Sequence, residues 1–566
     1  MEVLSNRGPH TLQYPGGPDD HDGIKEYVDG VVRQSQVYRI DIERGAIRNV
    51  LFYLGLQWIR FDASVRTWRP LALKRKTPRP VTNKLAALVN HLCSQLVQFK
   101  PPLTIGPGSQ DADDIAAATA GDKIREIIEQ ETNIRRLKPL AAKWLSTTGS
   151  TFLINGYDNS LETGTVFVPF DRCRACMKVV EPSAIEQTGG ACPECGAQVG
   201  FDIAATDAGE PIGEHYPRGK HVTEVKSLLE CYFDYEAGFL DYSPYFLISE
   251  SRSRDWIERT YGEKAATDLE WDDAKDLHAF YVESLAYTTG HSSRVINTGG
   301  SRTDPRVRIR RVWLRPDDRR APNGIYAVVG GGKILESGEW KYHDETGKPF
   351  LPVVHIPFDQ VPGRILGKSR IDDIIPKQEQ RNRIESILEL HSRRMANSVW
   401  LLPHGVGVSR ISGEQGQFIR YNALAGVPPP QRVSGDHPPP YLIDWLARID
   451  TEMDDIFGTQ EVSRGEVPKG VSAYAALQLL DERARQAQSG VFENWALGFS
   501  EWTRQHLDIW REYADEERTY QTGVGQWAIQ KFNKAHLQGG VDIDVEMGQN
   551  IPHTIIGRRA AVDQAV

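Results

Sequence analysis

The chain has 566 residues, of which 40% are hydrophobic and 25% are charged, a composition typical of a water-soluble globular protein. This length exceeds what one hydrophobic core usually holds, so we expect about two to four domains. The formal net charge is −9, from 67 basic and 76 acidic residues, which is opposite to the charge of a protein that simply coats DNA. No apolar run approaches ~18 residues, and the N-terminus lacks a basic and then apolar pattern, so neither a membrane span nor a secretory signal is expected.

The N-terminal two thirds of the chain predicts a mixture of helices and strands. After a flexible arm at residues 1–22, we expect helices at 24–36, 40–56, 83–98 and, around Asn133, two within 112–148. A basic loop at 73–80 is either a nucleic-acid contact or an ordinary solvated or intersubunit surface. A short edge strand is expected near 101–105, a hairpin from 149–155 and 163–170, strand-like runs within 220–250, and a helix at 252–269. Short strands at 307–313, 324–329, 333–335 and 353–358 indicate a mixed sheet.

Two CxxC pairs form the most specific local pattern, with fifteen residues between them. They offer the thiols of Cys173, Cys176, Cys192 and Cys195, at the local spacing that suits a tetrahedral zinc ion. A site with four cysteine ligands has no open coordination position, so its role would be structural, holding together an insertion of ~25 to 30 residues. The alternative is a loop of reduced or disulfide-bonded cysteines that has lost its metal. So few cysteines in a long chain favour a reducing compartment.

Three long helices are predicted in the C-terminal third. Within 362–400, apolar side chains recur at three- and four-residue spacing, with Ser369 as a candidate N-cap and Pro376 as a possible kink. The apolar positions are Ile371, Ile374, Ile375, Ile384, Ile387, Leu388, His391 and Met395. A second helix at 441–457 carries a stripe formed by Leu442, Trp445, Ile449, Met453 and Ile456, and Gly458 ends it. A third pattern runs from 473 to about 513 through Val491, Trp495, Phe499, Trp502 and Trp510.

Gly367 to Ser369 lead into IDDIIPKQEQRNRIES, Phe457–Gly458 end the second helix, and PKGVSAYA stands at 468–475. Near the N-terminus the chain has Asn49, Tyr53, Gly55, Gln57 and Trp58, followed by the PVTN run at 80–83. Through these motifs, taken in their order along the chain, the sequence resembles the portal proteins of tailed bacteriophages. The resemblance covers roughly residues 25–515, and the order of the motifs carries more weight than any one of them. At 472–475 the chain has Ser-Ala-Tyr-Ala where the family often has Ser-Gly-x-Ala.

The resemblance implies a predominantly helical α+β portal fold with wing, stem, clip and crown regions. After the arm, residues 23–361 would be the wing, with a zinc-ribbon insertion at 171–198. Residues 362–398 would be the first stem helix, 399–440 the clip, 441–458 the second stem helix and 459–472 the tunnel loop. The long wing and crown helix would span 473–515, and 516–566 would form the crown or C-terminal region. Arg464 and Lys469 would be the cationic groups of the tunnel loop facing DNA, or else ordinary solvated charges.

The function that the resemblance implies is non-enzymatic. A cyclic ring, in this family usually of twelve subunits, would occupy one capsid vertex of the virion after assembly in the host cytoplasm. Double-stranded DNA would pass through it, and the terminase large subunit, the capsid protein and head-tail adaptor or tail proteins would bind it, with no membrane involved. A mild negative charge suits a channel through which DNA slides, although many soluble proteins are slightly acidic.

The residues also bear on an enzymatic function and on a nucleic-acid-binding function without a channel. The GRILGKS run at 363–369 is similar to a phosphate-binding P-loop, but the loop needs four residues between its glycines, and Pro362 stands where the first should be. No HExxH or GxSxG pattern indicates a hydrolase. The remaining alternative is a zinc-ribbon nucleic-acid-binding or scaffold protein without a channel, which predicts a basic face and a monomer or dimer.

Overall fold

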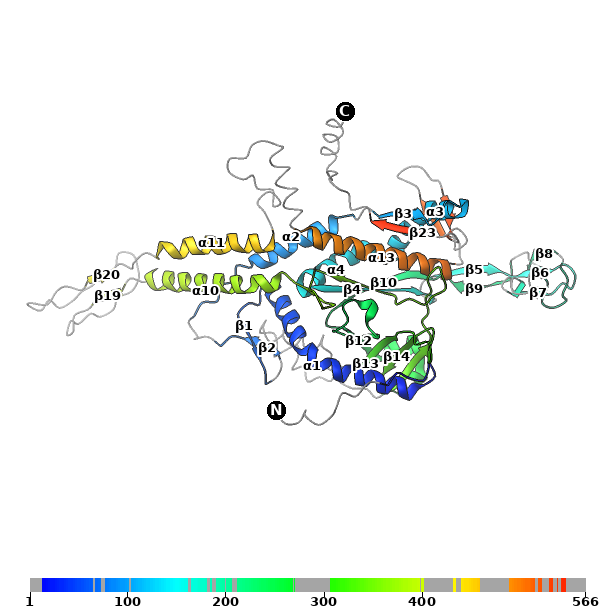
Figure 1. Cartoon of the computed structure of the whole chain (residues 1–566), viewed down its shortest axis with the longest axis horizontal. Helices are drawn as coiled ribbons and strands as arrows, with labels where there is room; N and C mark the ends of the chain where they lie inside the picture. The colour runs from blue at the N-terminus through cyan, green and yellow to red at the C-terminus, as the bar shows by residue number, and fades with distance from the viewer. Residues whose placement is uncertain are drawn as a thin grey trace, which may run out of the picture.

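The chain forms an elongated α+β structure in which helix is the larger share (Figure 1). A helical hairpin extends from one end of a central α/β body, and a small β-structure extends from the other. The computed structural model describes residues 13–64, 67–72, 77–100, 103–160, 164–180, 184–185, 190–198, 200–205, 211–267, 269, 306–396, 399–401, 431–433, 439–458, 488–514, 518–521, 529–532, 537 and 541–545.

The N-terminal helix α1 (His21–Tyr53) is continuous, so the prediction of two helices was wrong. The apolar pattern lapses near its middle because a buried polar residue, Arg39, occupies the inward face there. Its guanidinium donates hydrogen bonds to the carbonyl oxygens of Leu229 (2.6 Å), Leu228 (3.2 Å) and Cys231, and it lies 3.6 Å from the ring centroid of Tyr232. A charged side chain with this many partners can be buried without breaking the helix.

A five-stranded sheet packs against α1. Its strand order is β11 (Cys231–Phe233), β12 (Tyr245–Ser253), β13 (Arg306–Leu314), β14 (Ile325–Gly330) and β15 (Lys333–Gly338). Every pairing is antiparallel, which corrects the expected mixed sheet. Helix α1 covers one face through Ile24, Tyr27, Val28 and Val31. Helices α6 (Arg254–Tyr261) and α7 (Glu263–Thr267) pack through Ile257 and Ala266 against Val307, Ile309 and Val328 of the sheet.

A second sheet of three strands forms the centre of the body. Its order is β10 (Lys220–Ser227), β4 (Ser150–Asp158) and β16 (Val353–Pro357), and all pairs are antiparallel. The prediction that residues 149–155 pair with 163–170 was therefore wrong. The first six residues of β4 are buried, so this strand is central and takes neighbours on both sides from distant parts of the chain.

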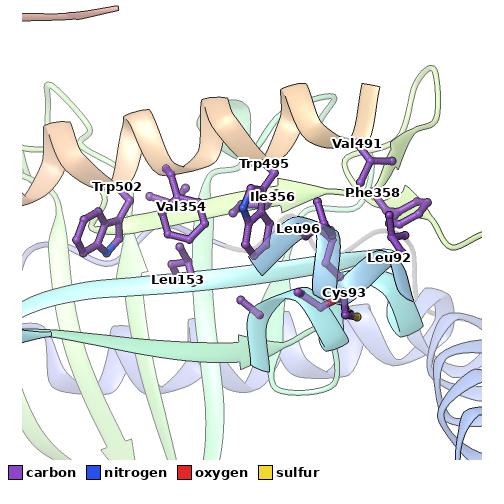
Figure 2. Close-up of a cluster of buried hydrophobic side chains, with 14 of the residues drawn as sticks. Leu92, Cys93, Leu96, Leu153, Val354, Ile356, Phe358, Val491, Trp495 and Trp502 are labelled. Carbon is purple, nitrogen blue, oxygen red and sulfur yellow. Dashed lines mark hydrogen bonds between the residues drawn. The ribbon is translucent and has the colours of Figure 1, made fainter. Parts of the chain in front are cut away.

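Helices cover this central sheet. Asn83 caps α2 (Lys84–Gln98), and α3 (Ala112–Glu131) and α4 (Ile134–Thr148) meet at Asn133 as predicted. Helix α13 (Ser489–Tyr513) lies along β16 and β4, and Figure 2 shows Trp495 and Trp502 pointing down to Val354, Ile356 and Leu153. The predicted apolar stripe from Val491 to Trp510 is confirmed as buried. Residues 473–487, the first part of the predicted long helix, lie outside the described residues.

Gly498 is the point of closest approach between α13 and β16. A β-carbon built there would lie 2.5 Å from Cγ1 of Ile356. In a helix, glycine to alanine ordinarily stabilises by roughly 0.5–1 kcal/mol, but here the added methyl group overpacks the core, at a cost of about 1–3 kcal/mol. We expect Gly498→Ala to lower the urea midpoint of unfolding.

Gly490 provides the matched control in the same helix, because a β-carbon there meets nothing within 4 Å. Gly490→Ala should leave the midpoint unchanged or raise it. Adding Ile356→Ala to Gly498→Ala should recover part of the overpacking loss. If both glycine variants behaved alike, the close packing of α13 on β16 would be wrong.

A buried polar network also fastens α13 to the sheet. His506 is fully buried, with its Nδ1 3.0 Å from Nδ1 of His221 and its Nε2 2.8 Å from the Thr223 hydroxyl. The Trp502 indole donates to the same hydroxyl at 3.0 Å, and His221 stacks on Trp510 with ring centroids 5.6 Å apart. Burial lowers the pKa of His506 to about 3, so the ring stays neutral in the folded protein at ordinary pH.

His506 should make stability fall in mild acid. Its unfolded pKa is about 6.5, so below that pH the unfolded chain binds a proton that the folded chain excludes until about pH 3. Asp508 acts oppositely between about pH 6 and its unfolded pKa of about 3.9, because burial raises its folded pKa to about 6. We expect His506→Gln to reduce the loss of unfolding free energy between pH 7 and 5.5 by about 1 kcal/mol, measured by urea titration. An unchanged pH dependence would contradict a neutral buried imidazole.

The helical hairpin consists of α10 (Ile371–Ala396) and α11 (Pro440–Phe457). The helices lie side by side and antiparallel, with the short pair β19 (Val399–Leu401) and β20 (Gln431–Val433) at the far tip (Figure 1). Helix α10 starts later than residue 362 because β18 (Gly367–Lys368) first pairs with β17 (Asp359–Gln360). Lys377 pairs with Glu452 at 2.6 Å and Arg381 with Asp450 at 2.8 Å across the hairpin.

The predicted apolar stripes of the hairpin are only partly buried. Buried members are Ile371, Ile374, Ile375 and Ile384 of α10, and Ile449 and Met453 of α11. In the single chain, Ile387, Trp445 and Ile456 of the same stripes are 53%, 51% and 38% exposed. Ile387 and Trp445 lie in the outer halves of the two helices, which continue past the body, so among the described residues they have only the other helix of the hairpin to pack against.

Several further strands pair in two-stranded sheets. Strand β1 (Ile59–Asp62) pairs with β2 (Thr67–Pro70), and β21 (Arg518–Gln521) pairs with β22 (Ile529–Phe532). Strand β23 (Val541–Val545) pairs with β3 (Leu103–Pro107), and Leu537 is buried in the main core. A segment near the C-terminus thus packs against the body beside α3.

Candidate metal centre

The four cysteines of the CxxC pairs lie in a small ribbon at the end of a two-stranded arm. The arm is formed by β5 (Thr165–Pro169) and β9 (Gly213–Pro217), which follow β4 and precede β10 in the chain (Figure 1). The ribbon contains β6 (Asp171–Cys173), β7 (Val179–Val180) and β8 (Phe201–Ile203), in the order β7-β6-β8. The insertion therefore extends to residue 203 rather than ending at 198, because β8 completes the sheet.

The structure brings all four predicted cysteines together. Their sulfur atoms lie within 4.8 Å of one another, and the Cys173–Cys195 and Cys176–Cys192 sulfur pairs are each 3.8 Å apart. Four sulfurs at zinc–thiolate bond lengths around a tetrahedral centre would be separated by roughly 3.8 Å. All six cysteines of the chain are free thiols. The four could therefore hold a metal ion such as zinc, and the donor set and spacing both fit a four-coordinate ion.

The two CxxC turns have the same backbone arrangement. In each, the residue after the second cysteine donates its N–H to the carbonyl oxygen of the first, from Met177 to Cys173 and from Gly196 to Cys192, both at 2.8 Å. Both donors have a left-handed backbone, with φ of 61° at Met177 and 68° at Gly196. Glycine adopts this conformation without cost, whereas methionine does so only when its surroundings impose it. The ribbon thus consists of two matching knuckles that point their thiols at a common centre.

The electrostatics of the cluster favour a bound cation. Backbone N–H groups of Cys176 and Ala175 lower the pKa of Cys173 to about 7, which favours the thiolate that binds metals. The Ala197 N–H favours the Cys195 thiolate, but burial and the neighbouring sulfurs outweigh it and raise the pKa of Cys195 to about 12. Four thiolates cannot ionise this close together unless a positive charge compensates them. A divalent cation would supply that charge.

The hydrophobic cluster of the ribbon is small in the part that the structure describes. It contains Cys173, Val180, Ile185 and Cys192, with Cys176, Ala184 and Phe201 packed against it. Two surface ion pairs, Arg174 with Asp202 and Lys178 with Glu194, add little stability because both partners are exposed. An ion held by all four thiols would have no open coordination position for a substrate.

A second group of residues singled out by the sequence meets at the foot of the helical hairpin. Gln378 donates to the Thr82 carbonyl oxygen and to the Asn382 side chain, both at 3.0 Å. Asn382 donates to Gln57 at 2.7 Å, and Gln57 donates to Asn83 at 3.0 Å. Gln57, Gln378 and Asn382 are buried. This chain of amide hydrogen bonds, here called the amide junction, fixes α10 to the end of α1 and the start of α2.

The glycine and serine before α10 belong to the same region. A β-carbon on Gly367 would lie 2.5 Å from the Gly149 carbonyl oxygen, so the two backbones approach too closely for any side chain. The Ser369 hydroxyl donates to the Ser146 carbonyl oxygen at 2.6 Å and accepts from the Ile371 N–H at 3.1 Å, which confirms its predicted role at the start of α10. Close packing at the foot of the hairpin thus accounts for both Gly367 and Ser369 of the GKS motif.

Sequence reasoning did not find the buried ion cluster between the two sheets. Arg311 of β13 lies 2.9 Å from Glu224 of β10 and 3.1 Å from Glu250 of β12. Lys226 lies 3.1 Å from each of the same two glutamates. In the sequence, charged residues recur at every second position of these strands, as in Glu224 and Lys226. A strand that faces solvent has the same alternation, so the pattern does not reveal a cluster between two sheets.

Arg464 and Lys469, the predicted tunnel-loop cations, lie outside the described residues, as does most of the predicted clip. No protein-family model matches the chain, and no curated protein matches it in sequence. Among the helices of the described residues, none combines the length and the apolar character that crossing a bilayer requires.

Proposed function

We propose that the protein is a portal protein with wing, stem, clip and crown regions. Identical subunits form a closed ring at one capsid vertex of a tailed bacteriophage, and double-stranded DNA passes through it during packaging and ejection. The role is non-catalytic: the ring provides a channel and a docking site for the terminase large subunit, the capsid protein and tail or adaptor proteins. The order of the sequence motifs and the form of the α10–α11 hairpin support this proposal.

The observation that carries the proposal is that α11 exposes apolar side chains on both sides of its buried stripe, here called its two flanks. Successive residues of a helix are about 100° apart, so Tyr441 and Trp445 lie on one side of the buried Ile449 and Met453, and Ile443 lies on the other. These three side chains are 63%, 51% and 54% exposed. A hairpin that stood alone in water would gain nothing from apolar residues on both sides. Packed between two neighbouring hairpins, it would bury both flanks.

Two different flanks on one subunit give a head-to-tail association. Such an interface either closes into a ring or continues as a filament. The hairpin is anchored to the body by the amide junction and by Lys84, whose ammonium group lies 2.9 Å from Asp454 of α11. In the ring, the body of each subunit would hold its α10–α11 hairpin in place, and the hairpins would line a central opening. In the family the number of subunits is usually twelve.

Zinc is proposed as the ion of the cysteine cluster, with a structural role. All-thiolate tetrahedral sites favour zinc or iron–sulfur centres, and the spacing of the two knuckles is that of zinc ribbons. The ion would hold the ribbon in shape at the end of its arm.

Native mass spectrometry and negative-stain microscopy of the purified chain test the proposed ring. We expect one closed oligomer with an axial opening, and we expect Trp445→Glu to release subunits because the new charge would be buried at the interface. Thr451→Glu is the matched control, since Thr451 is exposed on the side of α11 away from the buried stripe. A wild-type chain that stays monomeric or dimeric at high concentration, without an opening, would sink the proposal and favour a zinc-ribbon binding protein.

A further inference from the structure

The turn between β11 and β12 displays two aromatic side chains to solvent. It spans residues 234–244, includes the short 3₁₀ helix η2 (Leu240–Tyr242), and is here called the aromatic turn. Phe239 is 56% exposed and Tyr242 is 74% exposed. Their ring centroids are 6.1 Å apart in an edge-to-face arrangement, so the two rings form one patch. Aromatic side chains are enriched at the energetic centres of protein interfaces.

The aromatic turn is held rigidly. The Arg315 guanidinium donates to the carbonyl oxygens of Ser243 (2.7 Å) and Leu240 (3.1 Å). The Ser243 hydroxyl accepts from the Asp234 N–H at 3.0 Å and donates to the Tyr245 carbonyl oxygen at 2.6 Å. Leu240, which lies between Phe239 and Tyr242 in the sequence, is buried and anchors the turn. A partner would therefore meet the rings already in place, and ordering them would cost little on binding.

The aromatic turn carries three acidic residues and no basic one in its sequence. Asp234, Glu236 and Asp241 lie in the same turn, and the Asp241 side chain is 91% exposed. Arg315 is the nearby cation; it lies 3.7 Å from Asp241, but its N–H groups are directed at the two carbonyl oxygens. An acidic surface repels nucleic-acid phosphates and attracts cations. Aromatic rings beside carboxylates match the guanidinium group, which stacks on rings and pairs with carboxylates.

We propose that the aromatic turn binds an arginine-bearing segment of a protein partner. The arginine would lie against Phe239 or Tyr242 while Asp241 accepts its N–H groups. This binding site does not depend on the ring, on the metal centre or on a DNA channel, because all of its residues come from one turn of one subunit.

The test uses a fluorescently labelled nona-arginine peptide, and nona-lysine for comparison, with the full-length protein in fluorescence anisotropy at fixed salt. We expect nona-arginine to bind more tightly than nona-lysine, since stacking on aromatic rings favours the guanidinium. Phe239→Ala/Tyr242→Ala should weaken nona-arginine binding about tenfold and abolish the preference for arginine. Asp241→Asn should weaken both peptides.

Two control variants distinguish binding at the aromatic turn from nonspecific attraction of the peptide to the acidic protein. Tyr38→Ala removes a 57% exposed aromatic side chain from α1, and Asp255→Asn removes a charge from an exposed pair on α6. Both should bind nona-arginine as the wild type does. The proposal is overturned if the double variant binds like the wild type, or if the wild type binds both peptides equally. Unchanged circular dichroism of the double variant would show that its loss of binding is local.

Discussion

Replacing Cys192 with serine is expected to abolish stoichiometric metal binding and to unfold the ribbon while the body stays folded. Cys192 is buried, and its backbone N–H is bonded to the Ala197 carbonyl oxygen at 3.1 Å, so it helps shape the second knuckle as well as offering a thiolate. Even outer-shell changes cost metal sites about 10- to 100-fold in affinity, and loss of a direct ligand should cost more. Elemental analysis should find one zinc per wild-type chain and a small fraction of that in the variant.

The body should tolerate this change because the ribbon has its own separate cluster of buried side chains. Limited proteolysis should cut the variant between residues 171 and 203 and leave the remaining fragments associated. Cys93→Ala is the matched control: Cys93 is buried in the main core, so this variant should keep its metal and lose only some stability. A Cys192→Ser variant that retained a full equivalent of zinc would contradict the four-cysteine site.

Replacing Arg311 with methionine is expected to destabilise the body by about 1–3 kcal/mol, because Lys226 would lose its partner in compensating two glutamates, of which Glu250 is buried and Glu224 is 39% exposed. Glu224 and Glu250 would then face each other with less positive charge between them. In the intact protein Glu224 loses solvation on burial, but Arg311 and Lys226 outweigh this effect and lower its pKa to about 2. The measurement is the free energy of unfolding in urea at pH 7, compared with that of the wild type.

The control and the rescue for this prediction come from the same chain. Arg254→Met removes an exposed i,i+4 pair with Glu258 and should change stability by no more than about 0.5 kcal/mol. Combining Arg311→Met with Glu224→Gln should recover part of the loss, since the second change removes one of the stranded charges. A loss below 1 kcal/mol in Arg311→Met alone would show that the cluster is well solvated and does not join the two sheets.

Elements with an uninterrupted local pattern were predicted well. Helices α2, α3 and α4 and the inward face of α13 follow from the spacing of apolar residues, and Asn83 and Ser369 mark helix starts as expected. The failures occurred where distant residues decide the structure. Strand β4 pairs with β10 and β16, which no local signal indicates, and Arg39 breaks the apolar pattern of α1 because carbonyl groups from β11 and its neighbouring turn satisfy it.

The amino-acid sequence alone predicted the four-cysteine cluster, because each CxxC knuckle is a local turn and one short insertion keeps the two knuckles close together. The sequence also predicted which face of α13 is buried, because the spacing of apolar residues along a helix is a local property. Only the tertiary structure decided that Gln57, Asn83, Gln378 and Asn382 form one buried junction, and that the flanks of α11 stay exposed. A polar residue on an apolar face, or an apolar residue on a helix surface, reveals its role only when the elements packed around it are known.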